Sequence, residues 1–352
     1  MWLVSIQVCA DAVLLRHHPL YTSRVNHYRA YRCHQFGDYH DNLTIDELPI
    51  PEPGAYEVLI ETRACAVAFH EMLMVQGLYQ LKPPLPFTPG SEASGVVRAI
   101  GHAVRCFKPG DRVIGAVRYG AHAEMMVVPE ASCFQLPAAF DFAEGAAFLT
   151  AYKTAYVALV PRGALKAGET LLVHGASGGV GLAAVELGKH LGAVVIATAS
   201  TPAKLAVAKE KGADHLIDTS RENVRAAVKQ LTAGRGADVI YDPVGGDLFD
   251  ESMHCIATFG RLLVIGFASG RIPTVSVNYA LIKQISIVGV RAGEYGRQHP
   301  AGGAEVNRAL FKLAEEGRLR PRVHAHLPFD SLADAFDRLA AREVIGRLVL
   351  VK

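Results

Sequence analysis

The residues of this chain with the clearest chemical potential are the glycines of the segment 175–181. They follow a short apolar run at residues 171–173 and precede residues 182–191, which have helical periodicity; a second apolar run follows at 194–197. This order predicts strand, turn, helix and strand, which is one βαβ unit. Glycine lets such a turn approach a pyrophosphate closely, and the helix N-terminus offers unpaired N–H groups to it.

The context of these glycines carries the prediction, because any strand-to-helix turn can be rich in glycine. The match is to A-x-G-G-x-G, since alanine stands where the first glycine of the usual motif would be. We therefore predict a dinucleotide site here, and a purely structural turn is the alternative. The predicted cofactor contacts of the turn are Ala176, Gly178, Gly179, Val180 and Gly181.

The residues after the second strand help to choose the cofactor. NAD sites usually place an Asp or Glu there to accept a hydrogen bond from the ribose 2′-OH, but residues 197–204 contain no acid. They contain Ser200 and Lys204 instead, and a hydroxyl and an ammonium would hold the 2′-phosphate that a carboxylate would repel. The segment predicts NADPH. The alternative is that Lys204 is a solvated side chain on the next helix.

Composition excludes several other classes of protein. At 352 residues with 50% hydrophobic residues, the chain is long enough for two domains. Its net charge is +2 without a block of Lys and Arg, so a nucleic-acid partner is not indicated, and no apolar run has membrane-spanning length. The 6 cysteines form no C-x-x-C pair, which favours a cytoplasmic protein.

The elements around the glycine turn fall into three regions. Residues 1–28 lack a coherent apolar face, and we expect a poorly ordered, dispensable extension. From Tyr28, short alternating segments such as 28–33, 43–48 and 57–62 are separated by Pro and Gly turn signals, which predicts a β-rich domain. Beyond residue 152, apolar runs alternate with helical stretches, as a doubly wound parallel sheet requires.

Five motifs in the same order resemble the medium-chain dehydrogenase/reductase superfamily, in its zinc-free quinone oxidoreductase branch. They are residues 64–71, 76–79, 86–95, 110–113 and the glycine turn at 175–181. The resemblance implies a GroES-like catalytic domain over 29–151 and 292–352 and a Rossmann-type NADPH-binding domain over 152–291. It also implies a homodimer, consistent with the apolar run 285–290 as an uncovered last strand.

Zinc-dependent members of the superfamily have zinc ligands at two positions where this chain has other residues. Ala68 stands where they have cysteine, and Ser91 stands where they have histidine. Neither can hold zinc as a thiolate or imidazole would. The pair His70-Glu71 does not complete H-E-x-x-H, since Met74 occupies the last position. We therefore expect no metal.

The resemblance also suggests the residues near the nicotinamide and substrate. The quinone reductase branch usually has Asn at position 68 and often Tyr at position 73, where this chain has Ala and Leu. Tyr79 remains as the candidate catalytic residue, and an aromatic side chain packed under its loop is an equal alternative. His70 can replace the lost donor or be a solvated histidine. Further cofactor contacts implied by the resemblance or by strand ends are Thr154, Gly266, Phe267 and Arg342.

These observations predict zinc-independent reduction of quinones by hydride transfer from NADPH. Quinones need less polarisation than an isolated ketone, so a site without a Lewis acid favours them. Reduction of α,β-unsaturated carbonyls or enoyl thioesters is the alternative. A third reading, of another class, is an NADPH-binding sensor or structural protein with little turnover, since polar groups at positions 68 and 73 are lost. The sequence indicates no proton donor.

Overall fold

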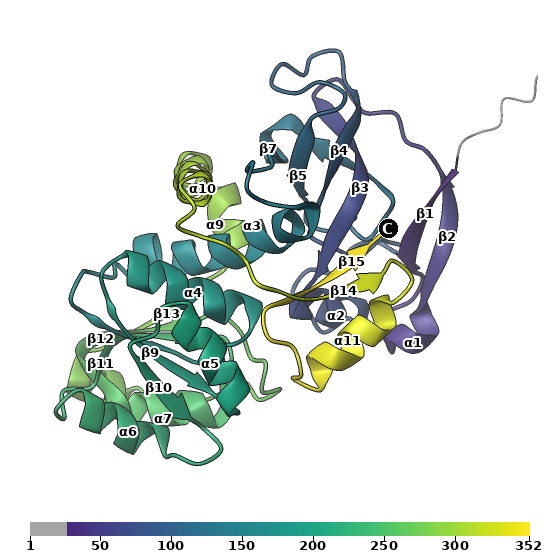
Figure 1. The fold of residues 1–352 in the computed structure, drawn as a ribbon. Helices are drawn as coiled ribbons and strands as arrows, with labels where there is room; N and C mark the ends of the chain where they lie inside the picture. The colour runs from purple at the N-terminus through teal and green to yellow at the C-terminus, as the bar shows by residue number, and fades with distance from the viewer. Residues whose placement is uncertain (1–26) are drawn as a thin grey trace, which may run out of the picture.

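The computed structural model describes residues 27–352 and shows two lobes side by side (Figure 1). The expected extension lies outside the described residues up to position 26, and the first strand, β1 (His27–Cys33), begins directly after it. Among residues 27–352, none of the helices combines the length and the apolar character that crossing a bilayer requires.

The first lobe is built on a parallel sheet with the strand order β10-β9-β8-β11-β12-β13. Its strands are β8 (Thr170–Val173), β9 (Val194–Ala199), β10 (His215–Asp218), β11 (Ala237–Asp242), β12 (Ile256–Val264) and β13 (Ser286–Gly289). The chain runs outward from β8 to β10 and then returns to lay β11 beside β8, so the order reverses between these two strands. This confirms the doubly wound sheet, and such a reversal is where these sheets bind ligands.

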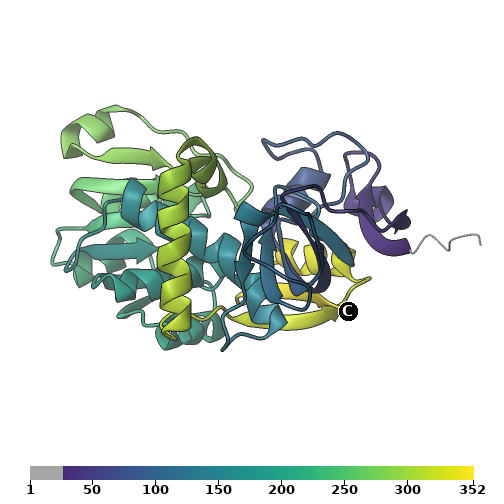
Figure 2. The ribbon, with the colours of Figure 1, turned by 90° about the horizontal axis from the view of Figure 1, so that it is seen from above.

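Helices cover both faces of this sheet (Figures 1 and 2). They are α4 (Gly179–His190), α5 (Pro202–Glu210), α6 (Val224–Leu231), α7 (Gly246–Cys255) and α8 (Asn278–Lys283). Because both faces are covered, β8 has no solvent-facing side: Leu171, Leu172 and Val173 are all fully buried. This explains why the strand reads as a continuous apolar run and does not alternate.

The second lobe is β-rich. Its sheet has the order β14-β15-β3-β4-β5-β7, with β6 paired to β3, and a separate hairpin-like pair joins β1 to β2. The strands are β2 (Leu43–Pro49), β3 (Glu57–Val67), β4 (Glu92–Ile100), β5 (Arg112–Ala116), β6 (Met125–Pro129), β7 (Cys133–Gln135), β14 (Val323–Pro328) and β15 (Arg347–Val351). The short helices are α1 (Tyr39–Asn42), α2 (Phe69–Val75), η1 (Glu130–Ser132) and α11 (Leu332–Ala340). The expected β-rich domain is confirmed, and the C-terminal strand β15 pairs with β3 in its sheet.

Helix α3 (Phe142–Val157) joins the two lobes and continues into the π-turn η2 (Ala158–Arg162). It starts in a capping box between Asp141 and Glu144. One of its faces carries Ala146 and Ala147, which pack with alanines of β3. Its other face carries Phe148 and Tyr152, which lie in the core of the cofactor sheet. The small residues let the helix approach β3 closely, as the alanine-rich sequence suggests.

Two helices after β13 also pack on the first lobe. They are α9 (Ala292–Gln298) and α10 (Pro300–Glu315), and α10 runs along the side of that lobe in Figure 2. Val306 and Leu310 of α10 share one core cluster with α3 and β8. The sequence predicts helices near 301–317 and 331–341, and the structure has α10 and α11 (Leu332–Ala340) there. The domain limits at 151 and 291 remain a proposal, because α3 and α10 both pack into the core of the cofactor sheet.

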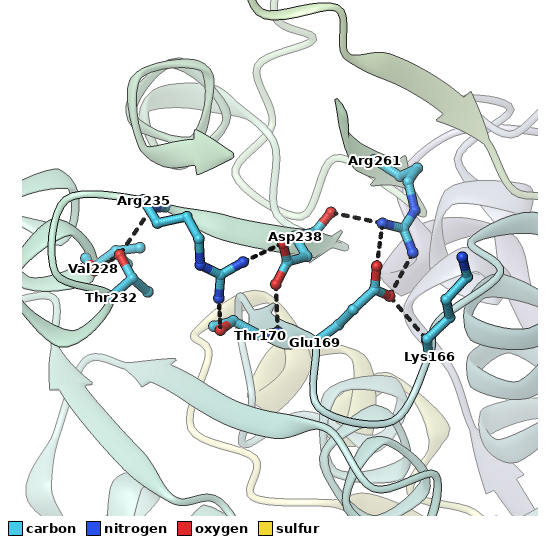
Figure 3. Close-up of polar contacts among 9 residues, drawn as sticks. Lys166, Glu169, Thr170, Val228, Thr232, Arg235, Asp238 and Arg261 are labelled. Atoms are coloured by element: carbon cyan, nitrogen blue, oxygen red, sulfur yellow. Dashed lines mark hydrogen bonds and ion pairs between the residues drawn. The ribbon is translucent and has the colours of Figure 1, made fainter. Parts of the chain in front are cut away.

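An ion-pair network, the Arg261 network, ties the amino ends of three neighbouring strands together (Figure 3). Arg261 of β12 donates to both carboxylate oxygens of Glu169, at 2.9 and 2.7 Å. Arg235 pairs with Asp238 of β11, and Asp238 accepts from the N–H of Thr170 in β8 at 2.7 Å. Ligands bind doubly wound sheets at the carboxyl ends, so this network lies at the opposite edge and serves the fold.

Candidate cofactor and active site

The glycine turn lies between the end of β8 and the start of α4. At Gly181 an added Cβ would lie 2.2 Å from the carbonyl oxygen of Gly175 and 2.9 Å from the Cα of Ala176. Such contacts with backbone atoms leave no room for any side chain, so glycine is required for the helix to pack this closely on the strand. The turn therefore has the close geometry that the sequence motif predicts.

The N-terminus of α4 is left without a capping side chain. Its N-cap residue, Gly178, makes no side-chain hydrogen bond, and an added Cβ there would meet only the Gly175 carbonyl oxygen, at 3.6 Å. The first N–H groups of a helix have no partner within it, and they carry partial positive charge. Helix α4 has 12 residues, and its uncapped N-terminus can donate hydrogen bonds to a phosphate that lies above the turn.

The structure brings Lys204 and Arg342 together, although 138 positions separate them. The Lys204 Nζ donates to the carbonyl oxygen of Arg342 at 2.6 Å; Lys204 is half-buried and Arg342 is exposed. Ser200 is exposed at the end of β9, and Thr201 caps α5 by accepting from the Lys204 N–H. Two cations and a hydroxyl thus lie beside the strand that follows the turn, where the sequence predicts the 2′-phosphate.

Gly266 and Phe267 follow the end of β12 and lie on the same side of the sheet as this cationic pair. The Arg342 guanidinium donates to the carbonyl oxygens of Ala268 and Ser269, both at 3.4 Å. The loop therefore spans from the carboxyl end of β12 to Arg342. One edge of the sheet is therefore surrounded by predicted cofactor contacts. They come from four separate segments: residues 200–204, residues 266–267, residue 342 and the glycine turn.

Arg347 is a buried residue beside the glycine turn that the sequence analysis did not single out. It is only 7% exposed at the start of β15, and its guanidinium donates to the Glu92 carboxylate at 2.9 Å. Its Cδ would be only 2.4 Å from a Cβ added to Gly179, so a side chain there would collide with it. The Arg347 Nε is buried without a partner. A second glycine of the turn thus makes room for an arginine whose N–H remains free. The only sequence signal was an arginine opening a strand that is otherwise apolar.

Glu92 connects this arginine to α3. Its second carboxylate oxygen accepts from the N–H of Thr150 at 2.7 Å. Burial raises the pKa of Glu92 to about 7, although Arg347 and the Thr150 N–H act in the opposite direction. Thr154, a predicted contact, lies one turn further along α3 and donates its hydroxyl to the Thr150 carbonyl oxygen at 2.7 Å. Thr154 is half-buried, and Glu92 links its helix to Arg347 and the glycine turn.

A second buried carboxylate contacts both positions at which zinc-dependent members of the superfamily have zinc ligands. Glu71 is fully buried and accepts from the Ser91 N–H at 2.8 Å and from the Ser91 hydroxyl at 2.6 Å. It also accepts from the Ala68 N–H at 2.9 Å, and His122 Nε2 lies 3.4 Å away. Burial by itself would raise the pKa of Glu71, but His122, His70 and the Ser91 hydroxyl lower it below its usual value.

These contacts do not fit a catalytic zinc. The Ser91 hydroxyl is committed to Glu71, and Ala68 offers no side-chain ligand. Within residues 27–352, no three His, Cys, Asp or Glu side chains gather in a metal-binding cluster.

Tyr79 and His70 form a separate pair in the β-rich lobe. Their ring centroids are 5.5 Å apart with the planes tilted by 47°. The His70 side chain is 28% exposed, and its Nε2 lies 4.0 Å from the Glu71 carboxylate. Burial lowers the pKa of His70, while the neighbouring Glu71 carboxylate acts in the opposite direction. The His70 side chain is therefore only partly exposed to solvent, and the Tyr79 ring packs against it.

Comparison with known proteins identifies the class of protein that this fold and site define. Residues 54–138 match the family model for the alcohol dehydrogenase GroES-like domain, and residues 179–309 match that for the zinc-binding dehydrogenase domain. Quinone oxidoreductase-like protein 2 of Mus musculus is 35% identical over 325 residues, covering 92% of this chain and 92% of its own. A quinone oxidoreductase of Pseudomonas aeruginosa is 37% identical over 304 residues, covering 85% of this chain and 92% of its own.

Solved structures agree with the sequence relatives. The structure of Escherichia coli quinone oxidoreductase complexed with NADPH has a TM-score of 0.85 at 29% identity, covering 92% of this chain and 100% of that one. The chain belongs to the medium-chain dehydrogenase/reductase superfamily, in its quinone oxidoreductase branch, and it is an oxidoreductase of this type. The resemblance noted in the sequence is thereby confirmed.

Proposed function

We propose that this protein is a zinc-independent, NADPH-dependent reductase of quinones. The observation that carries the proposal is the arrangement around the glycine turn. An uncapped helix N-terminus and the paired Lys204 and Arg342 lie at the carboxyl edge of the sheet. Relatives of this branch are quinone oxidoreductases, and the Escherichia coli structure holds NADPH. We assign the pyrophosphate to the turn, and the 2′-phosphate to Lys204 and Arg342.

The chain's own residues position the reactants. When bound, the nicotinamide supplies the hydride. Thr154 lies on the helix that faces both lobes, so we assign it to the nicotinamide side, and Glu92 holds that helix in register with Arg347. Since Glu71, Ser91 and Ala68 do not provide a Lewis-acid site, the oxygen of the substrate must be stabilised by hydrogen-bond donors. This favours substrates that accept hydride readily, of which quinones are the first choice.

His70 is the side chain best placed to deliver the proton that the reduced quinone requires in addition to the hydride. It is a partly exposed imidazole against Tyr79, with the Glu71 carboxylate behind it. In its imidazolium form His70 can transfer this proton and return to the neutral form, and a general acid is worth about 10²–10⁴-fold in rate. Replacing His70 with Gln should therefore lower kcat with little change in the affinity for NADPH. An unchanged kcat would assign the proton to water.

The test of the function is NADPH consumption measured by absorbance across a panel of quinones, enones and enoyl thioesters. Faster turnover with quinones than with the other acceptors supports the proposal. Faster turnover with α,β-unsaturated carbonyls or enoyl thioesters would support the alternative reductase, which the same zinc-free site admits. Saturable NADPH binding with no consumption on any acceptor would favour the sensor or structural protein.

We propose that the enzyme works as a homodimer in the cytoplasm. Strand β13 is the edge of the cofactor sheet, with β12 as its only ladder partner in the described sheet. The neighbouring α8 exposes Leu281 and Ile282 by 78% and 71%. An uncovered edge beside exposed apolar side chains favours association through this face. The cysteines of the described residues are free, which is consistent with a reducing compartment.

A further inference from the structure

Four cationic side chains gather around α9, where the two lobes meet. We call them the α9 cations, and they are Arg118, Lys153, Arg291 and Arg297. Lys153 belongs to α3, directly before Thr154, and its Nζ is 3.4 Å from the position of a Cβ added to Gly296 of α9. Arg291 directly precedes α9, and Arg297 lies in its last turn. The β-rich lobe contributes Arg118, two residues beyond the end of β5.

The α9 cations border the proposed reaction site from both lobes. Helix α9 follows β13 at the carboxyl edge of the parallel sheet, the edge that also carries the glycine turn. In the β-rich lobe, the N–H of Val117 donates to the Ser91 carbonyl oxygen at 2.9 Å, so the next residue, Arg118, lies close to Ser91. Lys153 neighbours Thr154, which we assigned to the nicotinamide side.

One carboxylate pairs with these cations. Glu294 of α9 accepts from the Arg297 Nε at 3.1 Å and from a terminal nitrogen of the same guanidinium at 2.8 Å. Hydrogen bonding to Arg297 lowers the pKa of Glu294, and the charges of Arg291 and Arg118 add to this effect. Among residues 27–352, Arg297 is the only one of the four cations with an ion-pair or side-chain hydrogen-bond partner. Positive charge is therefore in excess at this junction.

Lys153 is the least solvated of the α9 cations. Its side chain is half-buried, and burial together with the nearby Arg297 lowers its pKa. Both effects act against the charged form of a lysine, whereas an anion within hydrogen-bond distance would favour that form. The Lys153 Nζ is unpaired but not enclosed, so an anion can reach it from solvent. This accessible, unpaired ammonium is the observation that points to a ligand.

The cofactor phosphates lie too far away to serve as this anion. We assigned them to the glycine turn after β8 and to Lys204 beyond β9. In the strand order, β13 is three strand spacings from β8 and four from β9. At about 4.8 Å per spacing, these separations are roughly 14 and 19 Å. The anion would therefore be part of the substrate.

We propose that the α9 cations bind a carboxylate on the acceptor, so that the substrate is a quinone with a carboxylate substituent. Lys153 contacts the carboxylate, while the arginines attract it over a longer range. A charge-assisted hydrogen bond is stronger than a neutral one, so this contact discriminates between charged and neutral quinones. The inference rests on the proposed quinone reduction and adds the charge of its substrate.

The experiment compares a naphthoquinone carboxylate with the corresponding uncharged carboxamide, which has nearly the same size. The value of kcat/KM is measured for both with NADPH, on wild type, on Lys153→Met and on the control Lys312→Met. Methionine keeps an unbranched chain without the charge, and Lys312 is a 74% exposed lysine of α10 that lies near Glu316. Losing one charge-assisted contact should lower the carboxylate-to-carboxamide ratio in Lys153→Met by roughly tenfold. The control should keep the wild-type ratio.

Two further measurements keep the test decisive if Lys153→Met fails to fold. Arg118→Gln, at an exposed position, should lower the same ratio by a smaller factor. Added salt should lower it in wild type, because salt screens the attraction between accessible charges. An unchanged ratio in Lys153→Met would overturn the inference while quinone reduction stands. So would an unchanged ratio in Arg118→Gln together with no effect of salt.

A different result would show that the proposed function has failed, namely that neither quinone is reduced. Titration of both quinones into the NADPH-bound protein then decides the inference separately. Binding of the carboxylate that is roughly tenfold weaker in Lys153→Met, with the carboxamide little changed, supports it. Equal binding of the carboxylate to wild type and Lys153→Met overturns it.

Discussion

At the scale of single residues, Lys204 is the sharpest test of the cofactor assignment. A charge-assisted hydrogen bond is worth about 1.5–3 kcal/mol, so Lys204→Ala should weaken NADPH binding roughly 10- to 150-fold. The low end is expected, because we propose that Arg342, whose carbonyl oxygen accepts from Lys204, shares the same phosphate. NADH lacks the 2′-phosphate and should bind nearly as before. The measurement is the ratio of the two dissociation constants in wild type and variant.

Lys209→Ala is the matched control, because Lys209 lies on the same helix but donates to Asp214. It should leave the ratio unchanged. Equal weakening of NADPH and NADH by Lys204→Ala would mean that Lys204 supports the fold and not the phosphate. A preference for NADH in wild type would contradict the cofactor assignment itself.

Glu92 should make stability depend on pH. Its pKa is raised from 4.5 to about 7 in the folded protein, so the folded state binds more protons than the unfolded state between these values. Stability from this group is therefore complete below pH 4.5 and is lost as pH rises towards 7. Each pKa unit corresponds to about 1.4 kcal/mol, so the loss is on the order of 3 kcal/mol.

Urea unfolding of wild type and Glu92→Gln at several pH values measures this effect. The glutamine variant has no titrating group at this position and should lack that part of the slope. The stability of wild type relative to the variant should therefore decrease from pH 5 to pH 7. An increase over that interval would show that Arg347 dominates and keeps Glu92 ionised.

At the scale of elements, the two edges of the cofactor sheet have different tasks. The carboxyl ends of the strands lead into the glycine turn and the 266–267 loop, whereas the amino ends are tied by the Arg261 network (Figure 3). The Arg261 and Glu169 side chains are 19% and 21% exposed, so water screens the pair only in part. Burial alone would raise the pKa of Glu169, but the hydrogen bonds from Arg261 and the Lys166 N–H lower it.

Arg261→Met should separate these two tasks. It removes the five hydrogen bonds that Arg261 donates, two to the Glu169 carboxylate and one each to the carbonyl oxygens of Gly163, Ala164 and Asp238. The free energy of unfolding should fall by about 2 kcal/mol. The NADPH dissociation constant should stay the same, since the network lies at the other edge of the sheet. Urea unfolding and a cofactor titration on one preparation check both statements. A weakened cofactor at unchanged stability would contradict this division.

At the scale of the whole molecule, the exposed face of α8 and β13 predicts the oligomeric state. The wild-type protein should have twice the chain mass of 37.8 kDa by light scattering. Replacing Leu281 and Ile282 together with Asp should give monomers, because charge on an apolar contact face opposes association. Leu231→Asp is the control, since Leu231 is an exposed leucine at the end of α6. A monomeric wild type at micromolar concentration would refute the dimer.

Much of this fold was determined by the sequence alone, because its signals are local. The glycine turn, its flanking strands and the α10 and α11 helices follow from periodicity and turn residues that lie within one segment. The cofactor candidates at 176–181, 200 and 204 depend on the same local pattern. Such signals survive in a sequence because neighbouring residues are always neighbours in space.

Only the tertiary structure decided which distant side chains meet. Arg347 and Glu92 are 255 positions apart, and nothing near either residue predicts the buried pair that they form beside the glycine turn. Likewise, Phe311 of α10 stacks on Phe134 of the β-rich lobe, and no local signal pairs these two rings. Burial and charge pairing are properties of the packed chain, and so these parts of the site had no signature in the sequence.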